Sequence, residues 1–164
     1  MFASLCGLGC AADPPEDPAV VWCGAVCVAQ KRCGDTRSFE QCRVDCMTVR
    51  PGLANYSANG ARAGAPCLEK LTCSVFGDDV ASKAELDVCW KQAQLVVEVT
   101  PQVRSFCADY ARVWFECGYS LPIDVCERRY AMWAASVVDK LTLCVAEPTC
   151  DALHACDTVV FANL

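Results

Sequence analysis

Residues 115–126 read FECGYSLPIDVC, and residues 31–42 read KRCGDTRSFEQC. In both stretches a cysteine is followed at once by a glycine, and a second cysteine follows after seven more residues. Glycine takes the left-handed backbone conformation that ends many helices more easily than any other residue. Each stretch therefore predicts a tight turn between two helices, with Gly34 and Gly118 as the helix stops.

The two stretches belong to a longer internal repeat. A shift of 84 residues places three cysteines of the first copy on three of the second, Cys23, Cys33 and Cys42 on Cys107, Cys117 and Cys126. A shift of 77 residues places CLEKLTC, ending at Cys73, on CVAEPTC, ending at Cys150. AELDVC, ending at Cys89, then resembles DALHAC, ending at Cys156. Cysteines that recur in this order indicate a tandem duplication, with repeats at 18–92 and 101–160 and a linker at 93–100.

Local signals in both copies are helical. Asp17-Pro18 and Thr100-Pro101 each combine a capping side chain with a proline suited to the first helical turn. Residues 123 to about 143 contain no Gly or Pro and predict one long helix, and a short helix is expected from about Thr149. In the first copy, Pro51-Gly52 ends the second helix early, and the Asn, Gly and Ala content of residues 55–66 predicts a loop.

The predicted fold class is all-α, a tandem duplication of small disulfide-stapled helical hairpins. Each copy is expected to run long helix, tight turn, longer helix, short helix. The C-x9-C spacing within each copy is similar to that of small twin-C-x9-C helical hairpin proteins. That resemblance covers only one helix per copy, because the spacing across the turn here is C-x8-C.

The composition indicates an oxidised, exported protein. Sixteen of 164 residues are cysteine, a density typical of disulfide scaffolds outside the reducing cytosol. A net charge of −6 without a run of Lys or Arg argues against a nucleic-acid partner. No segment approaches the ~20 consecutive apolar residues of a membrane-spanning helix.

The N-terminal sequence resembles the end of a bacterial lipoprotein signal. Residues 1–10, MFASLCGLGC, are small and apolar, and the acidic, proline-rich residues 11–17 follow as a tether. Cys10 is then the lipidated residue, and the true start is expected upstream of Met1. The alternative is an ordinary tail in which Cys6 and Cys10 pair with each other or stay free.

Without Cys6 and Cys10, fourteen cysteines remain, enough for four bridges in the first copy and three in the second. Helix geometry at the turn predicts the pairs Cys33–Cys42 and Cys117–Cys126. A second rung, Cys27–Cys46, is expected because Ala111 and Tyr130 replace both of these cysteines in the other copy. An antiparallel third helix gives Cys144–Cys150 and Cys107–Cys156, and by homology Cys67–Cys73 and Cys23–Cys89. The four cysteines left over in each copy allow other pairings as well.

Metal binding is the main competing interpretation of the cysteines. Cys6/Cys10, Cys23/Cys27 and Cys42/Cys46 are C-x3-C pairs, which place two thiols on one helix face and would suit Cu(I). Zinc is disfavoured, because no C-x-x-C occurs and His154 is the only histidine.

Catalytic signals are lacking. No recognisable Ser, His and acid arrangement and no Gly-rich phosphate loop occurs, so we expect no enzyme, no catalytic residue, no cofactor and no metal. The tryptophans are interpreted as core residues, and one left exposed would be the first candidate for a partner-binding anchor. They are Trp22, Trp90, Trp114 and Trp133.

The function expected is that of a non-enzymatic, exported scaffold, an envelope lipoprotein that acts as a structural or protein-interaction module. Its partner would be an unknown protein, and it would touch a membrane only through the lipid anchor. The expected location is the bacterial periplasm or outer membrane, or the medium. The alternatives are a Cu(I)-thiolate storage protein and a small secreted effector.

Overall fold

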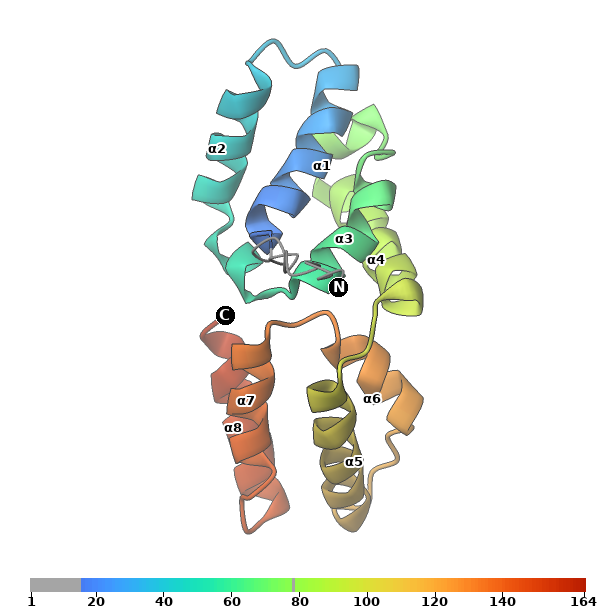
Figure 1. The fold of residues 1–164 in the computed structure, drawn as a ribbon, viewed down its shortest axis with the longest axis vertical. Coiled ribbons are helices and arrows are strands. Elements are labelled where there is room, and N and C mark those ends of the chain that lie inside the picture. Colours follow the sequence, from blue (N-terminus) through green and yellow to red (C-terminus); the bar gives the residue numbers. More distant parts are fainter. Residues whose placement is uncertain (1–15, 78) are drawn as a thin grey trace, which may run out of the picture.

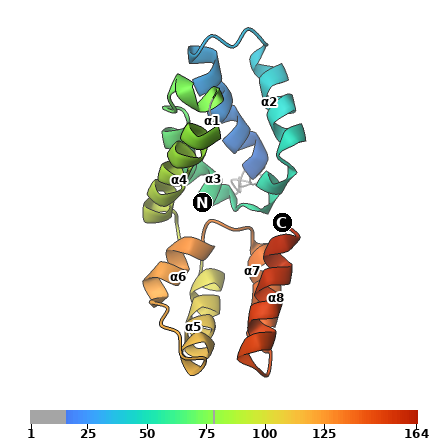
Figure 2. The same cartoon turned by 180° about the vertical axis from the view of Figure 1, so that it is seen from behind.

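The computed structural model describes residues 16–77 and 79–164, which form α-helices, two 3-10 helices and one isolated β-bridge (Figure 1). The first half of the chain contains α1 (Pro18–Arg32), α2 (Phe39–Val49), η1 (Pro51–Asn55), α3 (Ala58–Leu68), η2 (Cys73–Phe76) and α4 (Asp79–Val96). The second half contains α5 (Pro101–Glu116), α6 (Ile123–Tyr130), α7 (Ala135–Cys144) and α8 (Cys150–Ala162). The predicted all-α class is confirmed, and the two halves follow each other along the long axis of the molecule (Figures 1 and 2).

Both predicted helix starts are capped as the sequence indicates. The Asp17 carboxylate accepts a hydrogen bond from the Ala19 amide at 2.9 Å, and the Thr100 hydroxyl accepts one from the Val103 amide at 3.3 Å. These side chains satisfy backbone donors that have no partner within the first turn.

Both predicted glycine stops are also present. Gly34 and Gly118 have φ angles of 91° and 84°, the conformation that a side chain would strain. The residue after each glycine closes the helix end in the same way: the Tyr119 amide donates to the Trp114 carbonyl at 3.0 Å, and the equivalent bond in the first half is 3.1 Å long. The turns within residues 31–42 and 115–126 are thus built alike.

The single helix predicted over residues 123–143 is wrong, because contact with the other half divides it into α6 and α7. The Ser57 amide donates to the Met132 carbonyl at 2.8 Å, and the Ala134 amide donates to the Asn55 carbonyl at 2.8 Å. Backbone groups that bond across the halves cannot also serve a helical ladder, so the helix stops there.

This contact joins equivalent positions of the two halves. Tyr56 and Trp133 form the isolated antiparallel bridge, and the 77-residue shift that aligns the two copies places Tyr56 on Trp133. Their rings stack with centroids 5.0 Å apart and planes 11° apart. A self-complementary contact of this kind is what a two-fold axis produces, and it favours the duplication.

The loop predicted over residues 55–66 is wrong as well, since α3 occupies most of it. Ser57 caps this helix by accepting a hydrogen bond from the Gly60 amide at 2.8 Å. The small residues permit close packing: a Cβ on Gly60 would lie 2.8 Å from the Met132 carbonyl oxygen, and one on Gly64 would lie 3.2 Å from the Trp22 ring. A composition that is typical of loops serves here to bring α3 against its neighbours.

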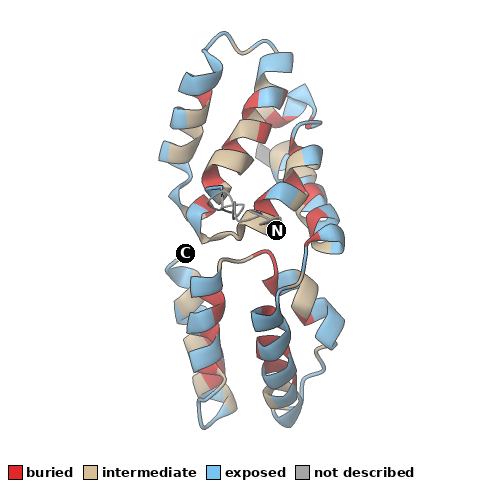
Figure 3. Cartoon of the chain, viewed as in Figure 1, coloured by how far each residue is buried: buried red, intermediate tan, exposed pale blue. Residues whose placement is uncertain are grey.

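Helix α4 connects the halves. It continues to Val96, so the first part of the predicted linker is helical, and Ala93 and Val97 are buried in the core of the second half. The buried positions face inward between the helices of each half (Figure 3). None of the described helices has the length and apolar character needed to cross a membrane.

Candidate functional site

All fourteen cysteines expected in bridges are bridged, four pairs in the first half and three in the second as predicted. None of the seven predicted pairs is among the observed bridges. The observed pairs are Cys23–Cys46, Cys27–Cys42, Cys33–Cys73, Cys67–Cys89, Cys107–Cys126, Cys117–Cys150 and Cys144–Cys156.

The predicted ladder between α1 and α2 is displaced by one rung. Instead of Cys33–Cys42 and Cys27–Cys46, the rungs are Cys27–Cys42 and Cys23–Cys46. Cysteines four residues apart lie on one face of a helix, so two C-x3-C pairs on antiparallel helices meet as two rungs. Cys33 lies beyond the end of α1, as its C-cap, and bonds to Cys73 instead.

The second half replaces these two rungs by one. Cys107 bonds to Cys126, with Cα atoms 5.7 Å apart, so the predicted pair Cys117–Cys126 is also wrong. Under the 84-residue shift this bridge is equivalent to a Cys23–Cys42 pair. Ala111 and Tyr130 stand where the first half has Cys27 and Cys46. The two cysteines that remain on these helices, Cys107 and Cys126, bond to each other, so no cysteine is left unpaired.

The remaining bridges correspond between the halves. Under the cysteine alignment, Cys33–Cys73 matches Cys117–Cys150, and Cys67–Cys89 matches Cys144–Cys156. The predicted pairs Cys67–Cys73, Cys144–Cys150, Cys23–Cys89 and Cys107–Cys156 are wrong. The cause is the same in both halves. Cys73, which follows α3, and Cys150, which follows α7, lie against the C-terminal ends of α1 and α5 and do not bond to the helix that precedes them.

The bridged state removes the thiolate donors on which the Cu(I) interpretation depends. A disulfide sulfur has no thiolate to offer, and the fourteen bridged cysteines include Cys23/Cys27 and Cys42/Cys46. Among the described residues no cluster of three or more His, Cys, Asp or Glu side chains is arranged to hold a metal. Cys6 and Cys10 lie outside the described residues.

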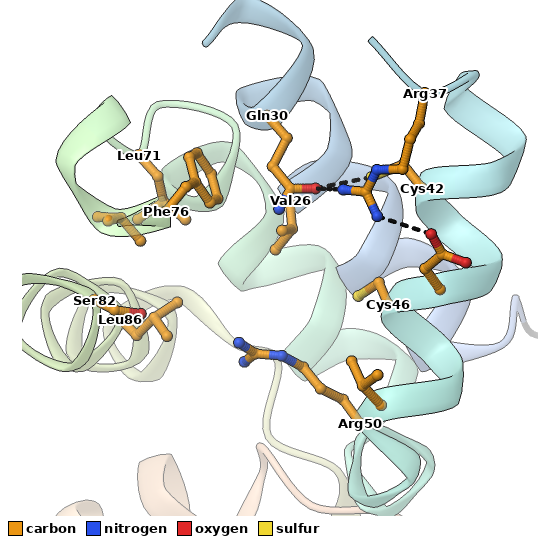
Figure 4. A pocket seen from close by; sticks show the side chains of 13 residues that line it. Val26, Gln30, Arg37, Cys42, Cys46, Arg50, Leu71, Phe76, Ser82 and Leu86 are labelled. Carbon is orange, nitrogen blue, oxygen red and sulfur yellow. Dashed lines mark hydrogen bonds and ion pairs between the residues drawn. The ribbon is translucent and has the colours of Figure 1, made fainter. Parts of the chain in front are cut away.

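A half-open cavity of about 330 Å³ lies in the first half between α1, α2, η2 and α4 (Figure 4). Its wall is nearly evenly divided between polar and apolar groups, and a cysteine of each α1–α2 bridge belongs to it. The apolar side chains are Val26, Val49, Leu71, Val75, Phe76 and Leu86. Its volume lies within the range of small-ligand sites; we call this one the first cavity.

Arg37 at the rim of the first cavity is fully paired. Its guanidinium lies 2.6 Å from the Asp35 carboxylate and 2.8 Å from the Asp45 carboxylate, and it donates to the Gln30 side-chain carbonyl at 3.2 Å. Hydrogen bonds from Arg37 lower the pKa of Asp35 to about 2. The Asp45 pKa is lowered by Gln41, which donates to it at 2.7 Å, and by Arg37.

Among the described residues that line the first cavity, Arg50 is the charged one whose side chain is left unpaired. Its side chain makes no hydrogen bond or ion pair with any described residue, and Figure 4 shows its guanidinium extended into the space between Leu86 and Cys46. Helix α2 ends directly before it and η1 begins directly after it, which fixes where its backbone lies.

A second cavity, of about 570 Å³, occupies the equivalent place in the second half. The 84-residue shift places Val26 on Tyr110 and Gln30 on Trp114, which line the two cavities at matching positions of α1 and α5. The second cavity is aromatic, with Tyr130 at the position of a bridged cysteine in the first.

Asp157 of α8 lies in the wall of the second cavity and is 8% exposed, the only buried charged residue among those described. One carboxylate oxygen accepts a hydrogen bond from the Tyr110 hydroxyl, and the other is buried without a partner. Burial raises the pKa of Asp157, while the Tyr110 hydroxyl and the charges of His154 and Arg129 lower it. The raised pKa reflects the cost of burying an incompletely bonded carboxylate.

No sequence motif marks Arg50 or Asp157, although the two copies, aligned position by position, differ at the residues of the cavity walls. His154 is exposed and packs edge-on against Trp114, with ring centroids 4.6 Å apart. Trp22 is buried and the other three tryptophans are partly buried, so none is an exposed anchor for a partner.

Comparisons with known protein families, with curated proteins and with solved structures find no match.

Proposed function

We propose that this protein is a non-enzymatic interaction module of the bacterial cell envelope, tethered through a lipid on Cys10. The observation that carries the proposal is the complete pairing of the fourteen described cysteines. Such a set of bridges forms and persists in an oxidising, extracytoplasmic compartment. The module would bind its partner through one of the two cavities that the helices of each half enclose.

The bridges support a binding role because they hold the cavity walls in place. In the first half they join α1 to α2 twice, α1 to η2, and α3 to α4. A site held in its bound shape loses less conformational entropy when a partner binds. Small repeats that bury only a modest core need such bridges for stability as well.

Membrane fractionation with intact mass analysis tests the proposal. The native protein should sediment with the envelope and carry a diacylglyceryl group on Cys10. Its polypeptide mass should be lower than that of the reduced chain by about 2 Da for each of seven bridges. The matched variant Cys10→Ser should keep the bridges and lose the envelope association.

Two results would contradict the proposal. Free thiols that bind copper stoichiometrically would favour the Cu(I)-thiolate alternative. An unlipidated, bridged protein released into the medium would favour the secreted-effector alternative.

A further inference from the structure

The first cavity combines three properties that together specify a ligand class: apolar side chains on several of its walls, a fixed shape and one unpaired positive charge. The apolar walls come from helices on opposite sides, with Val26 from α1, Leu86 from α4 and Phe76 from η2 (Figure 4). An apolar group that enters this space gains free energy in proportion to the apolar surface it removes from water.

The shape of the cavity is fixed by covalent and polar links between its walls. Besides the bridges, the Thr72 amide donates a 3.0 Å hydrogen bond to the Glu85 carboxylate, which ties the start of η2 to α4. The Cα atoms of the α1–α2 bridges lie 5.7 and 5.9 Å apart. No large rearrangement is therefore needed before a ligand can enter.

The electrostatics of the cavity favour an anion. Asp45, the only carboxylate among the described lining residues, has both oxygens occupied, one by Arg37 and the other by Gln41. Arg37 is paired in turn with two carboxylates, which leaves Arg50 as the cation available to a ligand. A cationic ligand would be repelled by the like charge of Arg50.

We propose that the first cavity binds a small carboxylate with an apolar body, whose carboxylate pairs with the Arg50 guanidinium while its apolar part contacts Val26, Phe76 and Leu86. Guanidinium and carboxylate form two parallel charge-assisted hydrogen bonds, a geometry that suits this pairing. The inference rests on the proposed binding function, for which it names the ligand class and the site.

The second cavity does not share this chemistry. Its aromatic wall fills the place of the bridges, and its buried charge is the carboxylate of Asp157. A carboxylate ligand there would meet a negative charge, so the inference concerns the first half alone.

Calorimetric titration of the oxidised full chain with decanoate, 1-decanol and decyltrimethylammonium, each at a concentration at which it is dissolved as single molecules, tests the inference. The three probes have the same chain and differ in charge. Decanoate should bind with one site per chain, and more tightly than decanol by about tenfold or more, as a charge-assisted hydrogen bond implies. Decyltrimethylammonium should bind most weakly.

Three variants locate the site. Arg50→Gln should weaken decanoate binding about tenfold and bring it close to that of decanol. Arg104→Gln removes an equal charge from an exposed position on α5 and should change nothing. Val26→Tyr, which introduces the residue found at this position in the second half, should fill the cavity and weaken both ligands together.

Equal binding of decanoate and decanol, or an Arg50→Gln variant that binds decanoate like the unmodified chain, would overturn the inference, as would no decanoate binding at all. The bridge count and lipid mass of the same preparation separate this failure from that of the proposed function. If the protein is lipidated and fully bridged but does not bind decanoate, only the ligand class is refuted. If the protein is reduced or cytosolic, the envelope role is refuted.

Discussion

The two halves of this chain share their bridges and turns but differ in how the first two helices are joined. In the first half two rungs link α1 to α2, and in the second half one rung links α5 to α6. Where the second half lacks a cysteine, Tyr130 enters the wall of the second cavity. The difference shows that a covalent rung and an aromatic side chain can fill equivalent places, and that this choice decides the chemistry of each cavity.

The largest expected effect concerns the shared bridges. Replacing Cys33 and Cys73 together by Ala should lower the free energy of unfolding by about 3–4 kcal/mol, because the bridge closes a loop of 40 residues. The equivalent change at Cys117 and Cys150 should cost nearly as much, since that separation is 33 residues. Urea unfolding measures both, and a large cost in one half only would break the comparison.

A smaller loss is expected when the first half is given the pattern of the second. In the double variant Cys27→Ala and Cys46→Tyr, Cys23 and Cys42 should bond to each other, as their equivalents do. The stability loss should then stay near that of one bridge, about 2–4 kcal/mol or less. Peptide mass mapping checks the new bridge, and free thiols at both positions would refute the equivalence.

The contact between the halves can be tested at Gly60. Gly60→Ala should destabilise the protein by about 1–3 kcal/mol, because the new Cβ would lie 2.8 Å from the Met132 carbonyl oxygen, a backbone atom. Gly77→Ala is the matched control, since nothing lies within 4 Å of a Cβ built there. Equal melting temperatures for the two variants would contradict the close approach of α3 to the second half.

The buried carboxylate of the second cavity predicts a dependence on pH. Because burial raises the pKa of Asp157 in the folded state, folding favours its protonated form, and stability falls as pH rises from the unfolded value of 3.8 through the folded one. Asp157→Asn cannot ionise and should be more stable than the unmodified chain at pH 7, by on the order of 1 kcal/mol. The difference should vanish below the unfolded pKa in urea titrations; a constant difference would contradict it.

The smallest effect is expected at the rim of the first cavity. Arg37→Gln should raise the pKa of Asp35 from about 2 toward the ordinary value of 3.8, with only a small loss of stability at pH 7 because solvent screens the exposed Arg37 guanidinium. The stabilisation from this pair is present above the unfolded pKa and is lost as pH falls toward 2. Carboxyl NMR titration reads the pKa directly, and an unchanged value would refute the pairing.

The sequence predicts the fold class and several helix starts and ends well, since these depend on local rules. The caps at Asp17 and Thr100 and the stops at Gly34 and Gly118 follow from residue type alone. The division of the predicted long helix does not, because it depends on the carbonyl of Met132 bonding to the other half.

The cysteine partners could not be predicted for a related reason. Heights along helices place Cys33 near Cys42, but not the direction in which a C-cap residue faces after its helix has ended. The C-x3-C spacing is the informative signal, because two such pairs on antiparallel helices meet as two rungs. The cavities depend on the packing of distant helices, so no motif marks Arg50 or Asp157, and only the differences between the two aligned copies point to the cavity walls.

Disulfide mapping of the native protein by non-reducing peptide mass spectrometry tests the central comparison most directly. We expect Cys33–Cys73 with its equivalent Cys117–Cys150, and Cys67–Cys89 with its equivalent Cys144–Cys156. Bridges across the turns, such as Cys33–Cys42 or Cys67–Cys73, or partners that do not correspond between the halves, would contradict the account.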